Sequence, residues 1–282
     1  MERQRTLEKE VSFSGKALQT GDMVKVTCRP QEENEGIVFK RVDLKGVPVL
    51  RLGSSALSDE YTRRSTISNG KSEVQTVEHF LAALWALGID NILVEIDGEE
   101  LPAMDGSARD FLKGLKQAGI KTQQERRKVI KILEEEKVEE GDRSLILTPA
   151  DVFSVSYSIA HDTPSIGHEV FDIELDQASF ESEIAPARTF CLKAEAEALL
   201  KAGLGKGATY ENTLVMDCDG PVGTVLRFSN EPLRHKILDL VGDLYMLGRP
   251  VIARVTARKS GHSLNGKMVQ KIHGKYIKKE SN

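Results

Sequence analysis

The stretch HFLAALWALGIDNILVEI (79–96) decides the fold, because a later stretch, HKILDLVGDLYMLGRPVIARVT (235–256), repeats its pattern. Each stretch opens with a histidine, continues as an apolar helical run, stops at a glycine and enters an apolar strand after a short link. A glycine just past the last turn is a common helix end. We interpret the pair as an internal duplication, and packing of the two halves with pseudo-symmetry would bring His79 and His235 to their interface.

The segments around these stretches alternate between strand and helix patterns. Short β-branched runs over residues 1–60, separated by glycine, proline and acidic clusters, predict strands and turns. One helix is expected from about Glu73 to Leu87, and another around 107–118. The second half repeats this order of strands, helix and strand.

A densely charged segment separates the two halves, and we place a domain boundary near residues 121–128. The predicted domains cover residues 1–124 and 125–282. Residues 191–216 have no counterpart in the first half, and we predict an inserted β-α-β-like element there.

The composition is that of a soluble globular protein, since 40% of the 282 residues are hydrophobic and 29% are charged. A net charge of -4 argues against a general affinity for nucleic acid. The longest uncharged apolar stretch, FLAALWALGI (80–89), is too short to span a membrane, and the charged N-terminus does not resemble a signal peptide. The three cysteines lack CxxC spacing and imply no disulfide framework. We therefore expect a cytoplasmic protein without stable membrane insertion.

Charged and polar side chains interrupt both apolar helical runs. His235 and Asp239 are four residues apart and lie on one helix face. Together with His79 they give two imidazoles and one carboxylate, the ligand count of a catalytic zinc site with one open position; ferrous iron would also fit. Glu78, beside a ligand, would then serve as the general base. The alternative is an exposed ion pair without a metal, but the matching positions in the duplication favour the metal site. No HExxH motif is present, which excludes a zincin protease.

The remaining histidines fall in polar segments. His262, in GHSLN (261–265), is expected in a loop, where an exposed imidazole could act as an acid; a turn histidine without a role is the alternative. His161, His168 and His273 are expected to be solvated surface residues.

The glycine-rich stretch GLGKGATYEN (203–212) invites comparison with a phosphate-binding loop. A Walker loop requires Ser or Thr after its lysine, whereas Gly207 follows Lys206 here. The stretch therefore predicts a flexible lid or binding loop, and a nucleoside triphosphatase is disfavoured.

Taken together, these segments resemble the zinc-dependent UDP-3-O-acyl-N-acetylglucosamine deacetylases of lipid A biosynthesis. The matching segments follow the family order over nearly the whole chain: TVEHFLAAL (76–84), DGSA (105–108), ARTFC (187–191), GLGKGA (203–208), NEPLRHKILDLVGDLYMLG (230–248) and GHSLN (261–265). The resemblance implies hydrolysis of the N-acetyl group of an acylated UDP-sugar, with release of acetate, at the committed step of that pathway. It also implies an α+β fold of two similar domains, each a mostly antiparallel sheet layered on helices. The helices of both domains would be sandwiched between the two sheets, with the active site at the domain interface.

The resemblance further assigns roles to individual residues. It implies that the zinc ligands are His79, His235 and Asp239. The implied catalytic residues are Glu78 as general base, His262 as general acid, Asp243 as the carboxylate that orients it, and Thr189 and Lys236 as groups that hold the oxyanion. The implied substrate-binding residues are Leu18, Thr189, Phe190, Leu192, Leu199, Gly207 and Lys236, with Phe190 near the nucleotide and the insert forming an apolar passage for the acyl chain.

One departure from the family pattern lies near the N-terminus, in GKALQTG (15–21), where Gln19 replaces the more common histidine. A contribution of this position to the metal site is therefore in doubt.

Two other functions stay open: a zinc amidohydrolase acting on another N-acyl sugar, and a catalytically silent α+β binding protein. The expected partner is the acylated UDP-sugar alone, with no nucleic acid, and the chain is expected to be a monomer.

Overall fold

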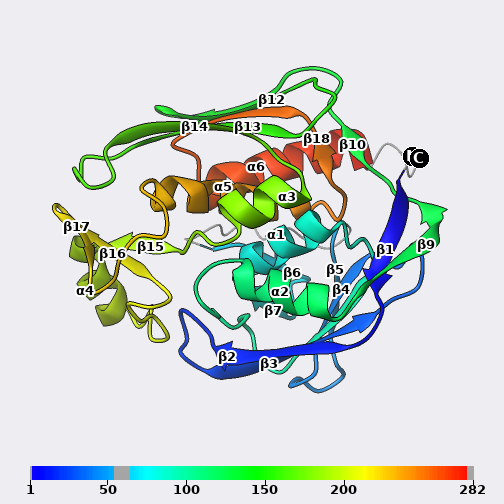
Figure 1. The fold of residues 1–282 in the computed structure, drawn as a ribbon. Helices are drawn as coiled ribbons and strands as arrows, with labels where there is room; N and C mark the ends of the chain where they lie inside the picture. The colour runs from blue at the N-terminus through cyan, green and yellow to red at the C-terminus, as the bar shows by residue number, and fades with distance from the viewer. Residues whose placement is uncertain (1, 54–63, 278–282) are drawn as a thin grey trace.

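Two five-stranded sheets form the outer layers of the protein in the computed structural model, which describes residues 2–53 and 64–277 (Figure 1). The first sheet contains, in spatial order, β2 (Val11–Lys16), β3 (Met23–Pro30), β8 (Ile92–Ile96), β4 (Ile37–Arg41) and β5 (Val49–Arg51). The second contains β11 (Glu136–Glu140), β12 (Arg143–Thr148), β19 (Arg254–Arg258), β13 (Ser154–Ala160) and β14 (His168–Glu174).

The two sheets have the same topology. In each, two hairpins come first in the chain, and a later strand is inserted between them after a helix. That central strand is parallel to one neighbour, β8 to β4 and β19 to β13, whereas the other neighbours in each sheet are antiparallel. The shared order supports the internal duplication, and the predicted α+β class with two similar, mostly antiparallel sheets is confirmed.

The main helices lie between the two sheets, as predicted (Figure 1). They are α1 (Glu78–Leu87), α2 (Arg109–Gln117), α5 (Glu231–Tyr245) and α6 (His262–Ile272). Helix α1 is buried at every position except Trp85, because it is covered on several sides. Gly88 ends it in the left-handed conformation, with φ of 64°, and its N–H donates to the carbonyls of Leu84 and Trp85.

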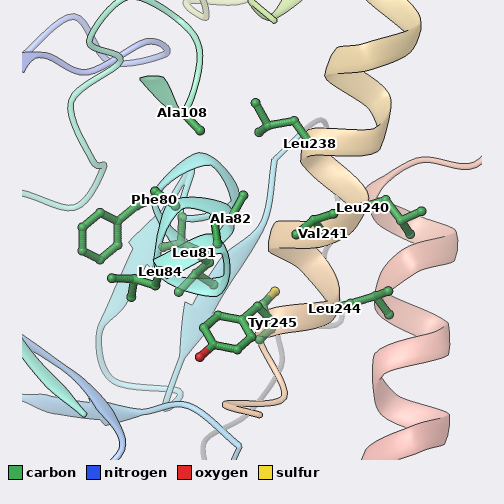
Figure 2. Close-up of a cluster of buried hydrophobic side chains, with 14 of the residues drawn as sticks. Phe80, Leu81, Ala82, Leu84, Ala108, Leu238, Leu240, Val241, Leu244 and Tyr245 are labelled. Carbon is green, nitrogen blue, oxygen red and sulfur yellow. The ribbon is translucent and has the colours of Figure 1, made fainter. Parts of the chain in front are cut away.

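Helices α1 and α5 pack directly against each other at the centre of the molecule. A Cβ at Gly242 of α5 would lie 2.0 Å from the carbonyl oxygen of Glu78, so only glycine permits this approach. Figure 2 shows Tyr245 of α5 beside α1, and Leu240 and Leu244 directed toward α6. The Tyr245 hydroxyl also donates to the carbonyl of Ile89 at 2.9 Å. Each such apolar side chain contributes about 1.5–3 kcal/mol through burial, so this packing fixes the position of one half relative to the other.

The start of α1 differs from the sequence prediction. Residues Glu73–Gln75 form strand β7, paired with β6 (Thr66–Ser68), and the helix begins only at Glu78. The reason is Thr76, whose φ of 55° is left-handed and incompatible with continuation of a helix. Its hydroxyl donates to Glu100 at 2.8 Å, which holds this conformation.

The segment predicted as an insert projects from one side of the layered core (Figure 1). The predicted range, 191–216, covers α4 (Lys193–Lys201) and most of β15 (Phe190–Leu192) and β16 (Leu214–Asp217), and β17 (Gly220–Val222) follows it in the chain. Strands β15 and β16 are parallel and are connected through α4, and β17 pairs with β16.

Short elements complete the fold. They are β1 (Arg3–Leu7) with β9 (Ile120–Arg126), β10 (Ile130–Lys131) with β18 (Val251–Ile252), α3 (Gln177–Ser179), and the π-helical segments η1 (Phe180–Ile184) and η2 (His273–Ile277). The division of the chain at residue 124 falls within β9 and stays a prediction.

Candidate active site

Six titratable side chains meet where α1, α5 and α6 come together. Their exposed fractions are at most 8%, and they are Glu78 and His79 on α1, His235, Asp239 and Asp243 on α5, and His262 on α6. Burial of so many ionisable groups is costly unless they pair with one another or bind a ligand. The structure thus brings together the residues that the sequence predicted as metal ligands, base and acid.

Three of these residues direct ligand atoms toward one point. Asp239 Oδ1 lies 3.2 Å from His235 Nε2 and 3.7 Å from His79 Nε2. His235 Nδ1 is 3.0 Å from the carbonyl oxygen of Ala187 and donates to it, which leaves Nε2 as the available nitrogen. Asp239 Oδ1 is fully buried and has no hydrogen-bond partner among the described residues. This donor set, with ligand atoms within 4.8 Å of one another, fits a divalent cation.

The protonation states of these groups also suit a cation. Burial lowers the pKa of His235 to about 3, so the imidazole is neutral, as a metal ligand must be. Burial opposes ionisation of Asp239, but the positive charges of Lys236 and His262 outweigh it and hold the pKa of Asp239 well below its usual value. A charged carboxylate, that of Asp239, and the neutral imidazole of His235 therefore face the same point.

Glu78 lies beside this donor set without belonging to it. Its Oε2 accepts a hydrogen bond from the backbone N–H of Ser65 at 3.1 Å, and its Oε1 is 3.8 Å from His262 Nε2. Burial raises the pKa of Glu78, although the neighbouring histidines oppose the shift. A raised pKa suits a group that accepts a proton near neutral pH.

His262 is not in an exposed loop, as the sequence suggested, but is the first residue of α6 and is buried. This helix start has no sequence signal, because its N-cap residue, Gly261, has no side chain that could form a cap. His262 Nδ1 donates to Asp243 Oδ2 at 2.9 Å, and Asn265 donates to the same oxygen at 2.7 Å. Burial lowers the pKa of His262, but Asp243, Asp239 and Glu78 outweigh burial and raise it to about 9. The imidazole is therefore cationic at neutral pH.

A cavity of about 410 Å³ opens onto this cluster. Six of the predicted substrate-binding residues line it: Leu18, Thr189, Phe190, Leu192, Leu199 and Lys236. Lys236 Nζ donates to Asp239 Oδ2 at 2.7 Å and lies 5.7 Å from the centre of the Phe190 ring. The backbone of Thr189 is fixed by its N–H bond to the carbonyl of Gly106 at 2.8 Å.

Gly207 is the one predicted substrate-binding residue that is not among those lining the cavity. A Cβ there would lie 2.0 Å from the carbonyl oxygen of Ala17, and its N–H donates to the carbonyl of Leu18 at 3.0 Å. Gly207 therefore allows the glycine-rich loop to pack against the turn between β2 and β3.

Gln19 belongs to that same turn and lines the cavity. Its side-chain oxygen accepts a hydrogen bond from Gly205 N at 3.0 Å, and its carbonyl accepts one from Lys206 N at 3.2 Å. The backbone N–H groups of Gln19 and Thr20 donate to the buried carboxylate of Glu100. Gln19 thus connects the glycine-rich loop to the turn between β2 and β3.

Other residues of the site were missed or misjudged from the sequence. Arg64 and His161 line the cavity, and His161 is half-buried rather than a solvated surface residue. His273 is also half-buried, and its Nε2 donates to the carbonyl of Gly53 at 2.6 Å. His168 is exposed, as predicted. Isolated histidines in polar segments carry no periodic signal, so their packing could not be predicted.

Fold and site together define an α+β protein with a candidate metal centre between two duplicated halves. The family model for "LpxC: UDP-3-O-acyl N-acetylglycosamine deacetylase" matches residues 4–274. The chain belongs to this family, which confirms the resemblance drawn from its motifs. Its members are deacetylases, enzymes that hydrolyse an amide.

Several individual relatives carry the same name. Proteins called UDP-3-O-acyl-N-acetylglucosamine deacetylase from Citrifermentans bemidjiense and Myxococcus xanthus are each 40% identical to this chain over 95% of its length, covering 88% and 86% of the relative. One from Pseudomonas entomophila is 40% identical over 96% of the chain and 90% of the relative.

Within the described residues, no helix has the length and apolar character needed to cross a membrane.

Proposed function

We propose that this chain hydrolyses the N-acetyl group of UDP-3-O-acyl-N-acetylglucosamine, giving acetate and UDP-3-O-acyl-glucosamine for lipid A biosynthesis. Family membership and the names of relatives at about 40% identity support the reaction. The observation that carries it is the convergence of three ligand atoms, a buried carboxylate and a cationic imidazole at one end of a cavity.

The proposed cofactor is one zinc ion held by His79, His235 and Asp239, and ferrous iron fits the same donors. A zinc ion held there supplies Lewis-acid chemistry, which polarises a carbonyl and makes water more acidic. The buried, unpartnered oxygen of Asp239 supports this assignment, because such an atom is costly without a positive partner.

The chain's own residues carry the proton transfers. Glu78 accepts a proton from water as the water oxygen forms a bond to the acetamide carbon. Lys236 and Thr189 line the cavity next to the ligands, where they stabilise the negative oxygen that forms on that carbon. His262, held cationic by Asp243, donates its proton to the amine nitrogen as the carbon–nitrogen bond breaks.

The remaining lining residues suit an acylated nucleotide sugar. Leu18, Leu192 and Leu199 are apolar lining residues that suit the acyl chain, and two of them come from the insert. Phe190 presents a ring, and its neighbour Lys236 a positive charge, to the polar part of the substrate. We retain the cytoplasm as the proposed compartment and the monomer as the proposed state, both on the sequence arguments.

The test is elemental analysis of the purified protein together with acetate release from UDP-3-O-acyl-N-acetylglucosamine before and after chelation. We expect one metal ion per chain, loss of acetate release on chelation, and recovery on addition of zinc. The same assay with a substrate lacking the 3-O-acyl chain should show most of the activity lost. Full activity on that substrate would indicate an amidohydrolase for another N-acyl sugar, and a chain inactive after metal reconstitution would indicate a binding protein.

A further inference from the structure

Ser65, which lies immediately before strand β6, is fully buried beside the proposed catalytic groups. Its carbonyl oxygen accepts a hydrogen bond from the N–H of Val77 at 3.3 Å, at the entry to α1. This bond ties Ser65 to the turn that positions the first helical residue, Glu78. Ser65 is therefore held in place by the same backbone that carries the proposed base.

The backbone N–H of Ser65 makes a direct contact with that base. It donates to Oε2 of Glu78 at 3.1 Å, whereas the other carboxylate oxygen, Oε1, is 3.8 Å from His262 Nε2. A fixed donor on one oxygen restricts rotation of the carboxylate. The other oxygen is then presented toward the centre of the site.

The hydroxyl of Ser65 contacts the acid side of the site. It donates to Oδ1 of Asp243 and lies 3.4 Å from Nδ1 of His262. The second oxygen of Asp243 is occupied by His262 and Asn265. The hydroxyl thus anchors the carboxylate oxygen that these two residues leave unused.

We propose that Ser65 is a positioning residue that holds the base Glu78 and the acid pair Asp243–His262 in one geometry. It contacts both through different atoms, the N–H and the hydroxyl, and it belongs to none of the three helices that carry them. Loss of the hydroxyl leaves a buried carboxylate oxygen without that donor and frees Asp243 to rotate with His262. The inference rests on the proposed deacetylase function.

The experiment compares Ser65→Ala and Ser65→Cys with the wild-type enzyme loaded with zinc. We expect Ser65→Ala to lower kcat roughly 10- to 100-fold, because small displacements of catalytic groups cost this much, while KM and metal content stay within about twofold. Cysteine keeps the size of the side chain but is a weak donor, so Ser65→Cys should resemble Ser65→Ala. If Ser65→Ala fails to fold, the kcat of Ser65→Cys tests the inference on its own.

The matched control is Ser72→Ala, in the turn between β6 and β7, where the hydroxyl donates to Asn69 rather than to a group of the site. It should keep wild-type kcat. A wild-type kcat in Ser65→Ala would overturn the inference. A wild-type kcat in Ser65→Cys would also overturn it, because it would show that the size of the side chain is sufficient and that the hydroxyl donor is not needed. An inactive wild-type enzyme would overturn the proposed function and this inference together, whereas an active wild type with active Ser65 variants overturns only this inference.

Discussion

The floor and the wall of the cavity are built differently. The floor consists of side chains from α1, α5 and α6 that are at most 8% exposed and bond to groups on other elements. The wall contributed by the insert contains α4, none of whose residues is buried, and Leu200 on it is 59% exposed. Both line one cavity, but only the floor is fixed from several sides.

This difference separates chemistry from recognition. Positions with several buried partners cannot shift without leaving polar groups unsatisfied, so the floor holds reacting groups in one geometry. Partly exposed apolar positions lose only part of their contact area when truncated. We therefore expect floor substitutions to change kcat and wall substitutions to change KM.

The largest effect in this comparison of floor and wall is expected from Glu78→Gln, a substitution in the floor. The amide cannot accept the proton of water, so we expect kcat to fall roughly 10²- to 10⁴-fold, with metal content unchanged because Glu78 is not a proposed ligand. Acetate release and elemental analysis measure the two quantities. Glu95→Gln, which alters a partly exposed carboxylate on β8 paired with Arg29, is the control and should retain full turnover. A Glu78→Gln enzyme near wild-type turnover would remove Glu78 as the base.

The next test is the pH dependence of kcat in wild type and Asp243→Asn. His262 must be protonated to act as the acid, and its pKa is raised to about 9, so wild-type turnover should fall as the pH rises through about 9. Of the charges that oppose the effect of burial on His262, Asp243 is the strongest. Its neutralisation lowers the pKa of His262, and the alkaline limb should therefore move to lower pH, with kcat reduced roughly 10- to 100-fold. If the alkaline limb of kcat lies at the same pH in Asp243→Asn as in wild type, Asp243 does not keep His262 protonated.

The smallest effect is expected at the wall. Leu199→Ala removes part of the apolar lining, so KM for a substrate with a long acyl chain should rise several-fold, at about 0.8 kcal/mol per CH₂ lost from contact. KM for a short-chain substrate and kcat should change little. Leu200→Ala, one position further along α4 and exposed to solvent, is the matched control. A drop in kcat at Leu199 without a change in KM would contradict the division between floor and wall.

The floor residues that could be predicted from the sequence are those that lie in periodic, apolar helical stretches. His79, His235 and Asp239 stood out because they interrupt apolar helices at matching places in a duplication. Ser65 could not be found in this way, since a lone serine before a short strand has no pattern, and its contacts to Glu78 and Asp243 come from distant parts of the chain. The contacts of Gln19 with the insert are of the same kind.

Local conformation caused the other errors. The start of α1 was placed too early because the left-handed Thr76 is stabilised by Glu100, a partner that lies 24 residues away. His262 was assigned to a loop because the helix that begins there has no side-chain cap. Both outcomes depend on tertiary contacts that local propensity does not contain.

The close contact of Gly242 with Glu78 has a consequence for how the protein folds. The two helices that meet there belong to opposite halves of the chain, and the proposed ligands are divided between them, so neither half alone presents the full donor set. Contacts between such distant segments form late, because loop closure must precede them. The site should therefore mature in one of the last steps of folding, and separately expressed halves should gain metal affinity only when they associate.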